Sequence, residues 1–407
     1  MGNPPYKRTL RPCPGCCARS GEVLHRQDFY LIEGHPLAKG YDVIACASCG
    51  FVYADTKVHQ REYDTFYQNM SKYADPLTGT GGGIQSWDFE RLQETAATIV
   101  EFLHSPQDRI LDIGCANGGL LSAIRDLGFC NLLGVDPSSS CVKAVRSKGI
   151  VASEGMLGSL KLSPGSFDCI LLSHVLEHVQ DLDVAMNNVV SLLKPNGVLY
   201  VEVPDASRYI DYLYAPFQDF NTEHINHFSQ RTMRAFGSRF GLAPANEHAK
   251  TIRSSESSLY PALWCVFRPS TQKLPIEPIG DLTEKIKLYI NASTKMMFEL
   301  DQRLERELLD ANGIIVWGVG QLAMKLLTLS VLNKTEIVAC VDSNPVLHGK
   351  NLLGARVVAP EAVKRFSHPI VITSLLHQTD IAGRIRAMGL DNRIVALRDR
   401  PDIPFVN

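Results

Sequence analysis

From residue 109 onwards, short apolar runs alternate with amphipathic segments along the chain. Buried strands are predicted by the runs over 109–114, 131–138, 167–176 and 197–204. Between them, helices that end in glycine are predicted over 118–128 and 140–149. Strands that alternate with helices in this way predict a mostly parallel sheet with helices on both faces.

The same alternation begins again at 313–320, after segments with a different pattern. A proline-rich stretch over 268–281 predicts a linker, and a long amphipathic helix is predicted over 282–309. Before the first strand, a mobile loop is predicted over the glycine-rich residues 78–84 and a helix over 87–104. The predicted fold class is therefore α/β, with an N-terminal cysteine-containing module, a central α/β domain and a linker helix with a second α/β domain, over 1–68, 69–280 and 281–407.

Composition and charge narrow the class of protein. Hydrophobic residues make up 45% of the 407 residues and charged residues 21%, so the chain can bury a sizeable core. The formal net charge of -2 argues against nucleic acid as a partner, because that binding needs concentrated Lys and Arg. No apolar run is long enough to span a bilayer and no signal core is present, so we expect no membrane partner and a cytoplasmic location.

Two Cys-x-x-Cys pairs lie near the N-terminus, Cys13 with Cys16 and Cys46 with Cys49. Thiolates at this spacing can hold one ion from a tight turn, and two such turns complete a tetrahedral four-sulfur zinc site. A redox Cys-x-x-Cys is the alternative, but it would need only one pair. Cys17 is a spare thiol that leaves the ligand choice slightly open. Because protein sulfur fills all four positions, the predicted zinc is structural.

A glycine-rich turn follows the first strand of the central domain. Gly114 and Gly118 let the backbone bend close to a ligand and open a helix. Twenty-four residues after Asp112, Asp136 ends the next strand, where a carboxylate can accept both ribose hydroxyls of an adenosine cofactor. The spacing differs from a dinucleotide fingerprint and favours S-adenosylmethionine, which has no pyrophosphate, with Asp112 near its ammonium. A nucleotide-binding or inert doubly wound domain is the alternative.

These motifs resemble the class I S-adenosylmethionine-dependent methyltransferases. The resemblance implies that Ser173 and His174 lie beside the methionine part of the cofactor, and that Met156 and Leu157 flank the adenine. Plain core packing is the alternative for Met156. The full set of expected cofactor-binding residues is Asp112, Gly114, Cys115, Gly118, Asp136, Pro137, Met156, Leu157, Ser173 and His174.

The segment over 217–233 carries the candidate catalytic groups. Glu223, His224 and His227 stand among aromatic residues, soon after the strand that ends at Pro204. Ligands bind at the carboxyl ends of strands in open α/β sheets, and a histidine held there by a neighbouring glutamate can take a proton from a substrate. The alternative is that these polar groups only hydrogen-bond the loop.

The whole layout resembles the nucleotide-sugar C-methyltransferases that act on 4-keto-6-deoxy sugars. It rests on the cysteine pairs, DIGCANGGLL, SHVLEHVQD, EHINHFS, VWGVGQLAMKLL and VDSNP. The resemblance implies a four-cysteine zinc module, a central methyltransferase domain and a C-terminal Rossmann-like domain. It also implies C-methylation through an enolate, with His224 as the base and Glu223 beside it.

The chain departs from that family just before Glu223. The family has Tyr and His at the two preceding positions, and this chain has Asn221 and Thr222. Asn221 is therefore a weaker candidate to hold the sugar or stabilise an enolate. O-methylation of a sugar or another small molecule stays open, with His224 or His227 as the base.

A second glycine-rich turn is found at Gly318 and Gly320, with Asp342 ending the strand that follows. By resemblance these residues bind the nucleotide sugar. An NAD-binding oxidoreductase fused to a methyltransferase is the rival interpretation, although no Tyr-x-x-x-Lys follows. An RNA methyltransferase with a zinc ribbon is a third, which the lack of a basic tract disfavours.

Overall fold

The computed structural model describes residues 6–70, 82, 84–256, 258–271 and 280–405. Two predicted segments lie mostly outside these residues, the mobile loop over 78–84 and the linker over 268–281. The chain forms two compact units, each built from more than one stretch of sequence. The first contains residues 1–24, 43–208 and 223–283, and the second contains 25–42, 209–222 and 284–407. The domain boundaries predicted at residues 68 and 280 stay a prediction.

The main sheet of the first unit has seven strands in the order β11-β12-β9-β8-β5-β6-β7. The five strands from β9 to β7 are parallel, as the alternating pattern predicted. Their bounds are β5 Ile110–Ile113, β6 Leu132–Asp136, β7 Val151–Glu154, β8 Phe167–Ser173 and β9 Leu193–Pro204.

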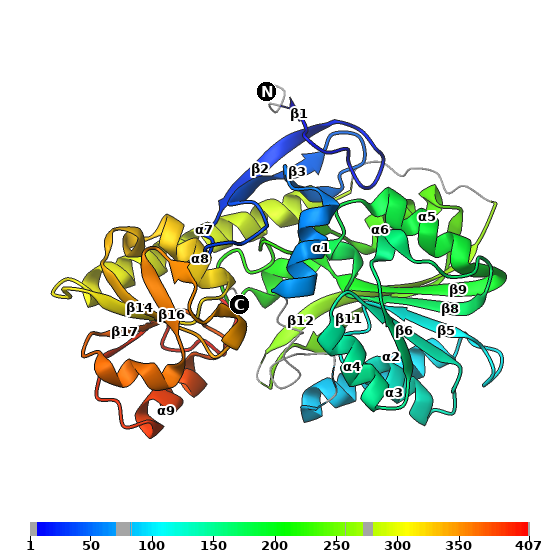
Figure 1. Ribbon diagram of the computed structural model, residues 1–407. Coiled ribbons are helices and arrows are strands. Elements are labelled where there is room, and N and C mark those ends of the chain that lie inside the picture. The colour runs from blue at the N-terminus through cyan, green and yellow to red at the C-terminus, as the bar shows by residue number, and fades with distance from the viewer. Residues whose placement is uncertain (1–5, 71–81, 83, 257, 272–279, 406–407) are drawn as a thin grey trace. The chain divides into compact units, whose positions relative to one another are not determined.

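Helices cover both faces of this sheet (Figure 1). On one face, α5 and α6 pack in a core cluster that also contains Cys13, Cys46 and Phe51 of the N-terminal module. On the other face, α2, α3 and α4 pack over β5 and β6. The bounds of these helices are α2 Ser86–Val100, α3 Gly119–Asp126, α4 Ser139–Ser147, α5 Leu182–Leu192 and α6 Gln230–Arg239.

An antiparallel pair extends the sheet beyond β9. Strand β11 (Leu242–Arg253) pairs with β12 (Leu259–Pro269), and β12 pairs with β9. Neither strand was predicted from the sequence. The strand predicted over 167–176 ends at Ser173 instead, because His174 has a φ of +55° and turns the chain out of β8 into a 3-10 helix over Leu176–His178. The predicted helix over 87–104 ends at Val100.

The N-terminal module forms a small sheet in the order β1-β2-β3-β4-β10. Its last strand comes from far along the chain, and pairs antiparallel with β4, Asn226 opposite Tyr53 and His227 opposite Val52. Helix α1 (Gln60–Asn69) follows β4. The strands are β1 Tyr6–Arg8, β2 Ser20–Asp28, β3 Gly40–Cys46, β4 Val52–Asp55 and β10 Asn226–His227.

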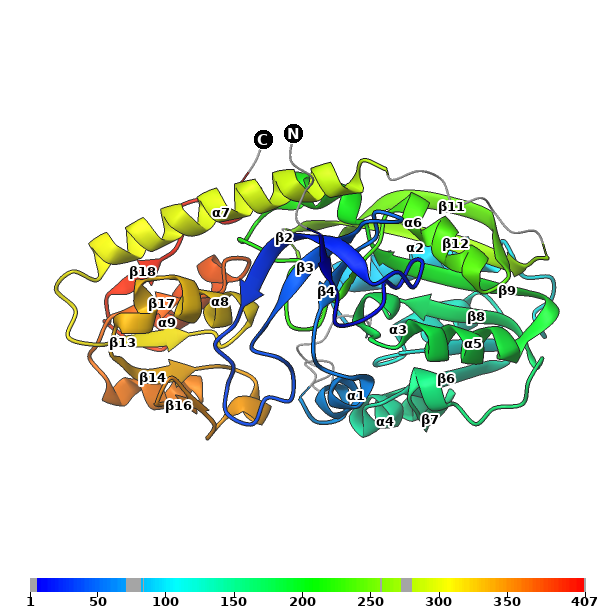
Figure 2. The same ribbon diagram turned by 90° about the horizontal axis from the view of Figure 1, so that it is seen from above.

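The second unit contains a sheet in the order β15-β16-β14-β13-β17-β18. All of its pairs are parallel except β15 with β16, so the second α/β pattern is confirmed. Figure 2 shows its helices α8 (Gln321–Leu329) and α9 (Gln378–Ala387) and the long α7 (Leu282–Glu307). The strands are β13 Ile314–Trp317, β14 Ile337–Val341, β15 Asn351–Leu352, β16 Ala355–Val358, β17 Ile370–Ile372 and β18 Ile394–Ala396. No helix within the described ranges combines the length and apolar character needed to cross a bilayer.

Candidate functional site

The first glycine-rich turn joins β5 to α3 and bends tightly at the end of the sheet. Gly114 and Gly118 have φ values of +78° and +74°, a conformation that favours glycine. A Cβ atom on Gly114 would lie 2.7 Å from Cγ2 of Val175, and one on Gly118 would lie 2.9 Å from Cγ2 of Val145. Both positions therefore need glycine for their backbone conformation and for the close packing of the turn.

Asp136 ends β6 beside this turn and holds its backbone. Its Oδ2 accepts a hydrogen bond from Ala116 N at 2.9 Å, and its Oδ1 accepts one from Ser138 N at 2.9 Å. Each carboxylate oxygen has a further lone pair, so both oxygens can still accept a hydroxyl hydrogen. The turn thus orients a carboxylate that can bind the two hydroxyls of a ribose.

Asp112 in β5 is the second acid at the turn, and only 3% of it is exposed. Burial, with a smaller contribution from the charge of Asp136, raises the pKa of Asp112 to about 7. A cation against this carboxyl group would favour its ionised form, because opposite charges stabilise each other. The ammonium of S-adenosylmethionine fits that requirement. Cys115 places its side chain in the core with α3 and α4, so its backbone is the part available to a ligand.

A cavity of about 390 Å³ opens at the carboxyl ends of β6 and β7. Pro137 and Met156, both expected to bind the cofactor, line it together with Gln68 of α1. Leu157, also expected there, packs against the core instead, and its carbonyl accepts a hydrogen bond from Asn188 Nδ2 at 3.0 Å. An adenosine whose ribose is held by Asp136 would extend into this cavity, because Pro137 follows directly in the chain.

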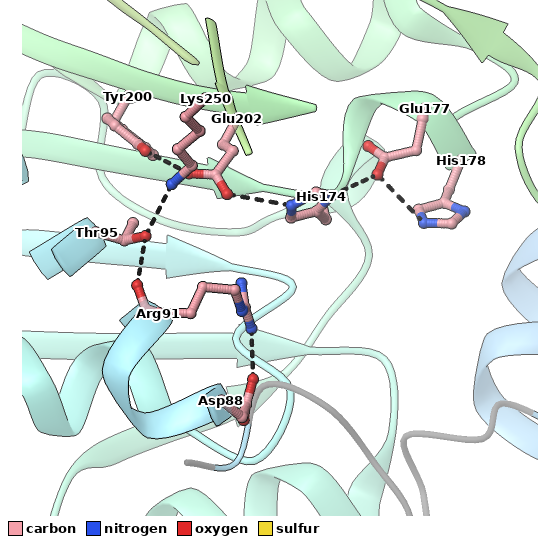
Figure 3. Close-up of polar contacts among 9 residues, drawn as sticks. All are labelled: Asp88, Arg91, Thr95, His174, Glu177, His178, Tyr200, Glu202 and Lys250. Carbon is pink, nitrogen blue, oxygen red and sulfur yellow. Dashed lines mark hydrogen bonds and ion pairs between the residues drawn. The ribbon is translucent and has the colours of Figure 1, made fainter. Parts of the chain in front are cut away.

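At the end of β8, next to Ser173, His174 is held between two glutamates (Figure 3). Its Nδ1 lies 3.2 Å from Glu177 Oε1, and its Nε2 lies 3.2 Å from Glu202 Oε1. Burial opposes a charge on the ring, but the two hydrogen-bonded carboxylates outweigh it and raise the pKa of His174 to about 9. A charged imidazole donates through both nitrogens, so His174 fixes the end of β8 and cannot serve as a base at neutral pH.

Glu202 connects this histidine to a wider polar network. It is fully buried in β9, where it accepts a hydrogen bond from Tyr200 Oη at 2.5 Å and pairs with Lys250 Nζ at 2.5 Å. Burial would raise the pKa of Glu202, but Lys250 and His174 lower it below the ordinary range. Lys250 also donates to Thr95 Oγ1 of α2 at 3.1 Å, so the network ties the antiparallel strands to the parallel part of the sheet (Figure 3).

A second cluster, which we call the histidine cluster, consists of Tyr67, Glu177, His178, Glu223 and His224. The rings of His178 and His224 meet edge to face, with centroids 4.7 Å apart. Tyr67 Oη lies 2.8 Å from His178 Nδ1 and 3.5 Å from Glu223 Oε2. The structure therefore brings the predicted pair Glu223 and His224 against a phenol and a second imidazole.

Backbone contacts between distant segments assemble this cluster. Ile225 N donates to Glu177 O at 2.8 Å, which joins the residue after His224 to the 3-10 helix that follows β8. Asn226 Nδ2 donates to Leu176 O at 2.8 Å and to Val179 O at 2.7 Å. The side chain of Asn226 is held in turn by Arg11 Nη2 at 2.6 Å. The N-terminal module thus supports the segment that carries His224.

Tyr67, Glu177 and His178 were not singled out from the sequence. His178 and Glu177 belong to SHVLEHV, a motif from which only Ser173 and His174 were chosen. Two histidines four residues apart, with a glutamate between them, could have marked the segment as polar and functional. For Tyr67 we find no comparable signal, because its role depends on where α1 packs.

His227, the other candidate base, lies in β10 opposite Val52, and its catalytic role stays a prediction. It is fully buried in β10, and burial together with the charge of Arg11 lowers the pKa of His227 to about 3. A ring with so low a pKa is a poor proton acceptor at neutral pH. Asn221 belongs to the second unit, where its Nδ2 donates to Gln218 O at 3.3 Å and its carbonyl accepts from Tyr41 Oη at 2.8 Å.

The four predicted zinc ligands form one group in the N-terminal module. The Sγ atoms of Cys13 and Cys49 lie 3.6 Å apart, and those of Cys16 and Cys46 lie 3.5 Å apart. Four sulfurs at 2.3 Å from one tetrahedral ion would lie about 3.8 Å apart. Ser48 N, 3.4 Å from Cys46 Sγ, adds a hydrogen bond to one sulfur. The arrangement fits a single four-sulfur ion.

The second glycine-rich turn, in the second unit, repeats the hydrogen-bond pattern of the first. Gly318 has a φ of +100°, and its N–H donates to Val341 O at 2.8 Å. Asp342 Oδ2 accepts from Val319 N, and Asp342 Oδ1 accepts from Asn344 N, both at 2.8 Å. Gly320 precedes α8 with a φ of −90°, and no atom lies within 4 Å of where its Cβ would stand.

Two family models match separate parts of the chain. Residues 85–247 match a family described as a methyltransferase domain. Residues 310–396 match one described as C2185-like, N-terminal.

Among known proteins, a ubiquinone biosynthesis O-methyltransferase of Xanthomonas campestris is 29% identical over 150 residues, which cover 35% of this chain and 60% of that protein. One of Bradyrhizobium diazoefficiens is 36% identical over 98 residues, covering 23% of this chain and 38% of that protein. The chain therefore spans about 60% of the first relative's length, and less of the second.

Similar solved structures include an S-adenosylmethionine-dependent methyltransferase from Mesorhizobium loti, with a TM-score of 0.37 and 19% identity over 44% of this chain and 99% of that one. Another is the 1,6-didemethyltoxoflavin-N1-methyltransferase of Burkholderia thailandensis with bound 1,6-didemethyltoxoflavin and S-adenosylhomocysteine. Its TM-score is 0.39 and its identity 14%, over 55% of this chain and 98% of that one.

The turn, the two acids and the family match together define the class. Residues 85–247 therefore form a methyltransferase domain, to which the S-adenosylmethionine-dependent class assigned from the sequence applies.

Proposed function

We propose that the enzyme transfers a methyl group from S-adenosylmethionine to a carbon atom beside the carbonyl of a nucleotide-linked ketosugar. The observation that supports this most is the histidine cluster, in which a phenol and two imidazoles adjoin Glu223. C-methylation needs a base for the carbon-bound proton and a hydrogen-bond donor for the enolate oxygen. His224 supplies the base, and Tyr67 supplies a phenol although position 221 lacks the tyrosine of the resembled family.

In the proposed reaction, His224 takes the proton from the carbon next to the ketone. The electron pair of that C–H bond becomes the enolate, whose oxygen accepts a hydrogen bond from a donor of the cluster. The bound cofactor supplies an electrophilic methyl group on a sulfonium. A carbon–carbon bond then forms as the sulfur–methyl bond breaks, which leaves S-adenosylhomocysteine. Asp112 and Asp136 hold the cofactor, and by resemblance Gly318, Gly320 and Asp342 hold the nucleotide.

The test uses a panel of nucleotide-linked 4-ketosugars in D₂O, with and without S-adenosylmethionine. Proton abstraction predicts deuterium at the carbon next to the ketone, and a new C–CH₃ signal by NMR when the cofactor is present. His224→Ala should lower both exchange and turnover by roughly 10²- to 10⁴-fold, because general-base catalysis contributes about that much. Binding of S-adenosylhomocysteine should not change.

The matched control is His104→Ala, which removes an exposed histidine outside the cluster and should leave both rates unchanged. Methylation without exchange, with the new signal on oxygen, would show that the acceptor is a hydroxyl. That second candidate function is favoured by the relatives from Xanthomonas and Bradyrhizobium, which are named O-methyltransferases. It would use the same His224 to accept a hydroxyl proton.

We also propose that Cys13, Cys16, Cys46 and Cys49 bind one structural zinc ion. The distances between their sulfurs support this, because four thiolates around one tetrahedral ion would lie about as far apart. Purified protein should contain one zinc per chain, and Cys46→Ala should lose it and melt at a lower temperature. Cys130→Ala, which removes an exposed thiol elsewhere, should keep the zinc. A metal-free wild-type protein with unchanged stability would contradict the proposal.

A further inference from the structure

The histidine cluster contains a second set of side chains that could bind a metal ion, in addition to the four cysteines. One ligand atom from each of Glu177, His178 and His224 lies within 4.8 Å of the other two. Two imidazoles and one carboxylate form a common protein site for zinc-like divalent cations, and three protein ligands leave a position for a small ligand. The same side chains can therefore bind a metal ion or accept a proton.

The buried carboxylate of Glu177 is suited to binding a cation. Glu177 is 1% exposed, and its Oε1 faces His174. Among the described residues, its buried Oε2 has no hydrogen-bond partner. A buried carboxylate oxygen without a partner is costly, and a cation is the ligand that compensates it best.

The ring of His178 is also oriented as metal ligands usually are. Its Nδ1 lies 3.3 Å from the carbonyl of Glu223 and 2.8 Å from Tyr67 Oη, so these groups fix the ring from one side. That leaves Nε2, which lies 3.7 Å from Glu177 Oε1, to face the cluster. A ligating histidine typically donates its other N–H to a carbonyl in this manner, which sets the tautomer. His178 and His224 are both partly exposed, so an ion can reach them.

We propose that Glu177, His178 and His224 form a second metal site, which binds a divalent cation of the zinc class and thereby blocks the base. The blocking role rests on the proposed function, in which a nitrogen of His224 must accept a proton. A lone pair that binds a metal ion cannot accept that proton. Free zinc then acts as a reversible inhibitor of methyl transfer, while the four-cysteine site keeps its own ion.

The binding half is tested with Co²⁺, added to full-length protein whose cysteine site already holds zinc. Cobalt on nitrogen and oxygen gives visible absorption bands without the strong near-ultraviolet bands of cobalt–thiolate bonds, so the two sites can be told apart. Glu177→Gln and His224→Ala should each weaken this binding by about 100-fold or more, because both are direct ligands and the loss of a supporting residue alone costs about 10- to 100-fold. His104→Ala should bind as the wild type does. No visible bands in the wild type, or bands that His224→Ala leaves unchanged, would overturn the site.

The blocking half is tested by adding zinc to the methyl-transfer assay and then removing it with a chelator. Inhibition that the chelator reverses, with the cysteine-bound zinc still present by metal analysis, is expected. Metal binding without inhibition would overturn the blocking role. A protein that exchanges no proton of any ketosugar would overturn the proposed function instead, while the cobalt titration would still report on the site.

Discussion

The two glycine-rich turns share a hydrogen-bond pattern and differ in buried charge. In each, the N–H of the first glycine donates to the neighbouring strand, from Gly114 to Val135 O and from Gly318 to Val341 O. In each, the acid at the carboxyl end of that strand or just after it accepts one N–H from the turn and one from two residues further on. The same hydrogen bonds therefore occur in both turns, although the glycine before the helix has a φ of +74° in the first turn and −90° in the second.

The difference lies two residues before the first glycine. Asp112 stands there in the first turn and Val316 in the second, and both are buried. A buried carboxyl group is costly, whereas a buried valine is favourable. The first turn therefore contains a buried group that destabilises the free protein and that a bound cation would stabilise. The second turn contains no such group. The second turn is accordingly not expected to bind the ammonium of S-adenosylmethionine.

The largest expected effect comes from removing the acid of one turn at a time. Asp136→Ala should weaken S-adenosylhomocysteine binding by roughly 10²- to 10⁴-fold, because two hydrogen bonds to a charged acceptor are worth about 1.5–3 kcal/mol each. Asp342→Ala, the matched change in the second turn, should leave that affinity unchanged. Titration calorimetry of both variants measures the contrast, and equal losses would mean that the two turns are not functionally distinct.

How far the sequence predicts this site depends on whether the contacts are local. Gly114, Gly118 and Asp136 could be identified because they belong to one strand–turn–helix–strand unit, whose parts follow one another in the chain. The histidine cluster could not be assembled from the sequence, since it depends on hydrogen bonds from Ile225 and Asn226 to the 3-10 helix after β8.

Another non-local pairing explains why His227 is buried. His227 lies only three residues after His224, yet β10 pairs with β4 of the N-terminal module and buries its ring. Sequence spacing indicates that both histidines belong to one segment. It cannot indicate which of them a distant strand will cover.

The next largest effect is a pH dependence of cofactor binding, which Asp112 should cause in the first turn. The pKa of Asp112 is raised to about 7, so below that pH the carboxyl group must lose a proton before it can pair with an ammonium. The affinity for S-adenosylhomocysteine should therefore fall nearly tenfold for each pH unit below about 7 and stay level just above it. Asp112→Val should bind more weakly, with no such dependence. Calorimetry across this range measures both, and an equal pH slope in the variant would assign the proton to another group.

The same carboxyl group should also affect stability without ligand. Its ordinary pKa is 3.8 and its folded pKa is about 7, so the folded state keeps the proton over this window while the unfolded state releases it. Its favourable contribution is complete below pH 3.8 and is lost as the pH rises to about 7, by about 1.4 kcal/mol for each unit. Relative to Asp112→Val, the ligand-free wild type should become less stable across that window. Denaturant unfolding of the two proteins at several pH values tests this.

The smallest expected effect compares one glycine in each turn. Gly118→Ala would put a Cβ atom 2.9 Å from Val145 Cγ2 at a φ of +74°, whereas Gly320→Ala meets no atom within 4 Å at a φ of −90°. The first change should destabilise the protein by about 1–3 kcal/mol, the cost of a strained backbone position, and the second should change stability by less than about 0.5 kcal/mol. Denaturant melts measure both values. Equal losses would mean that the second turn also needs a glycine there, for a ligand or a conformation that its backbone alone does not require.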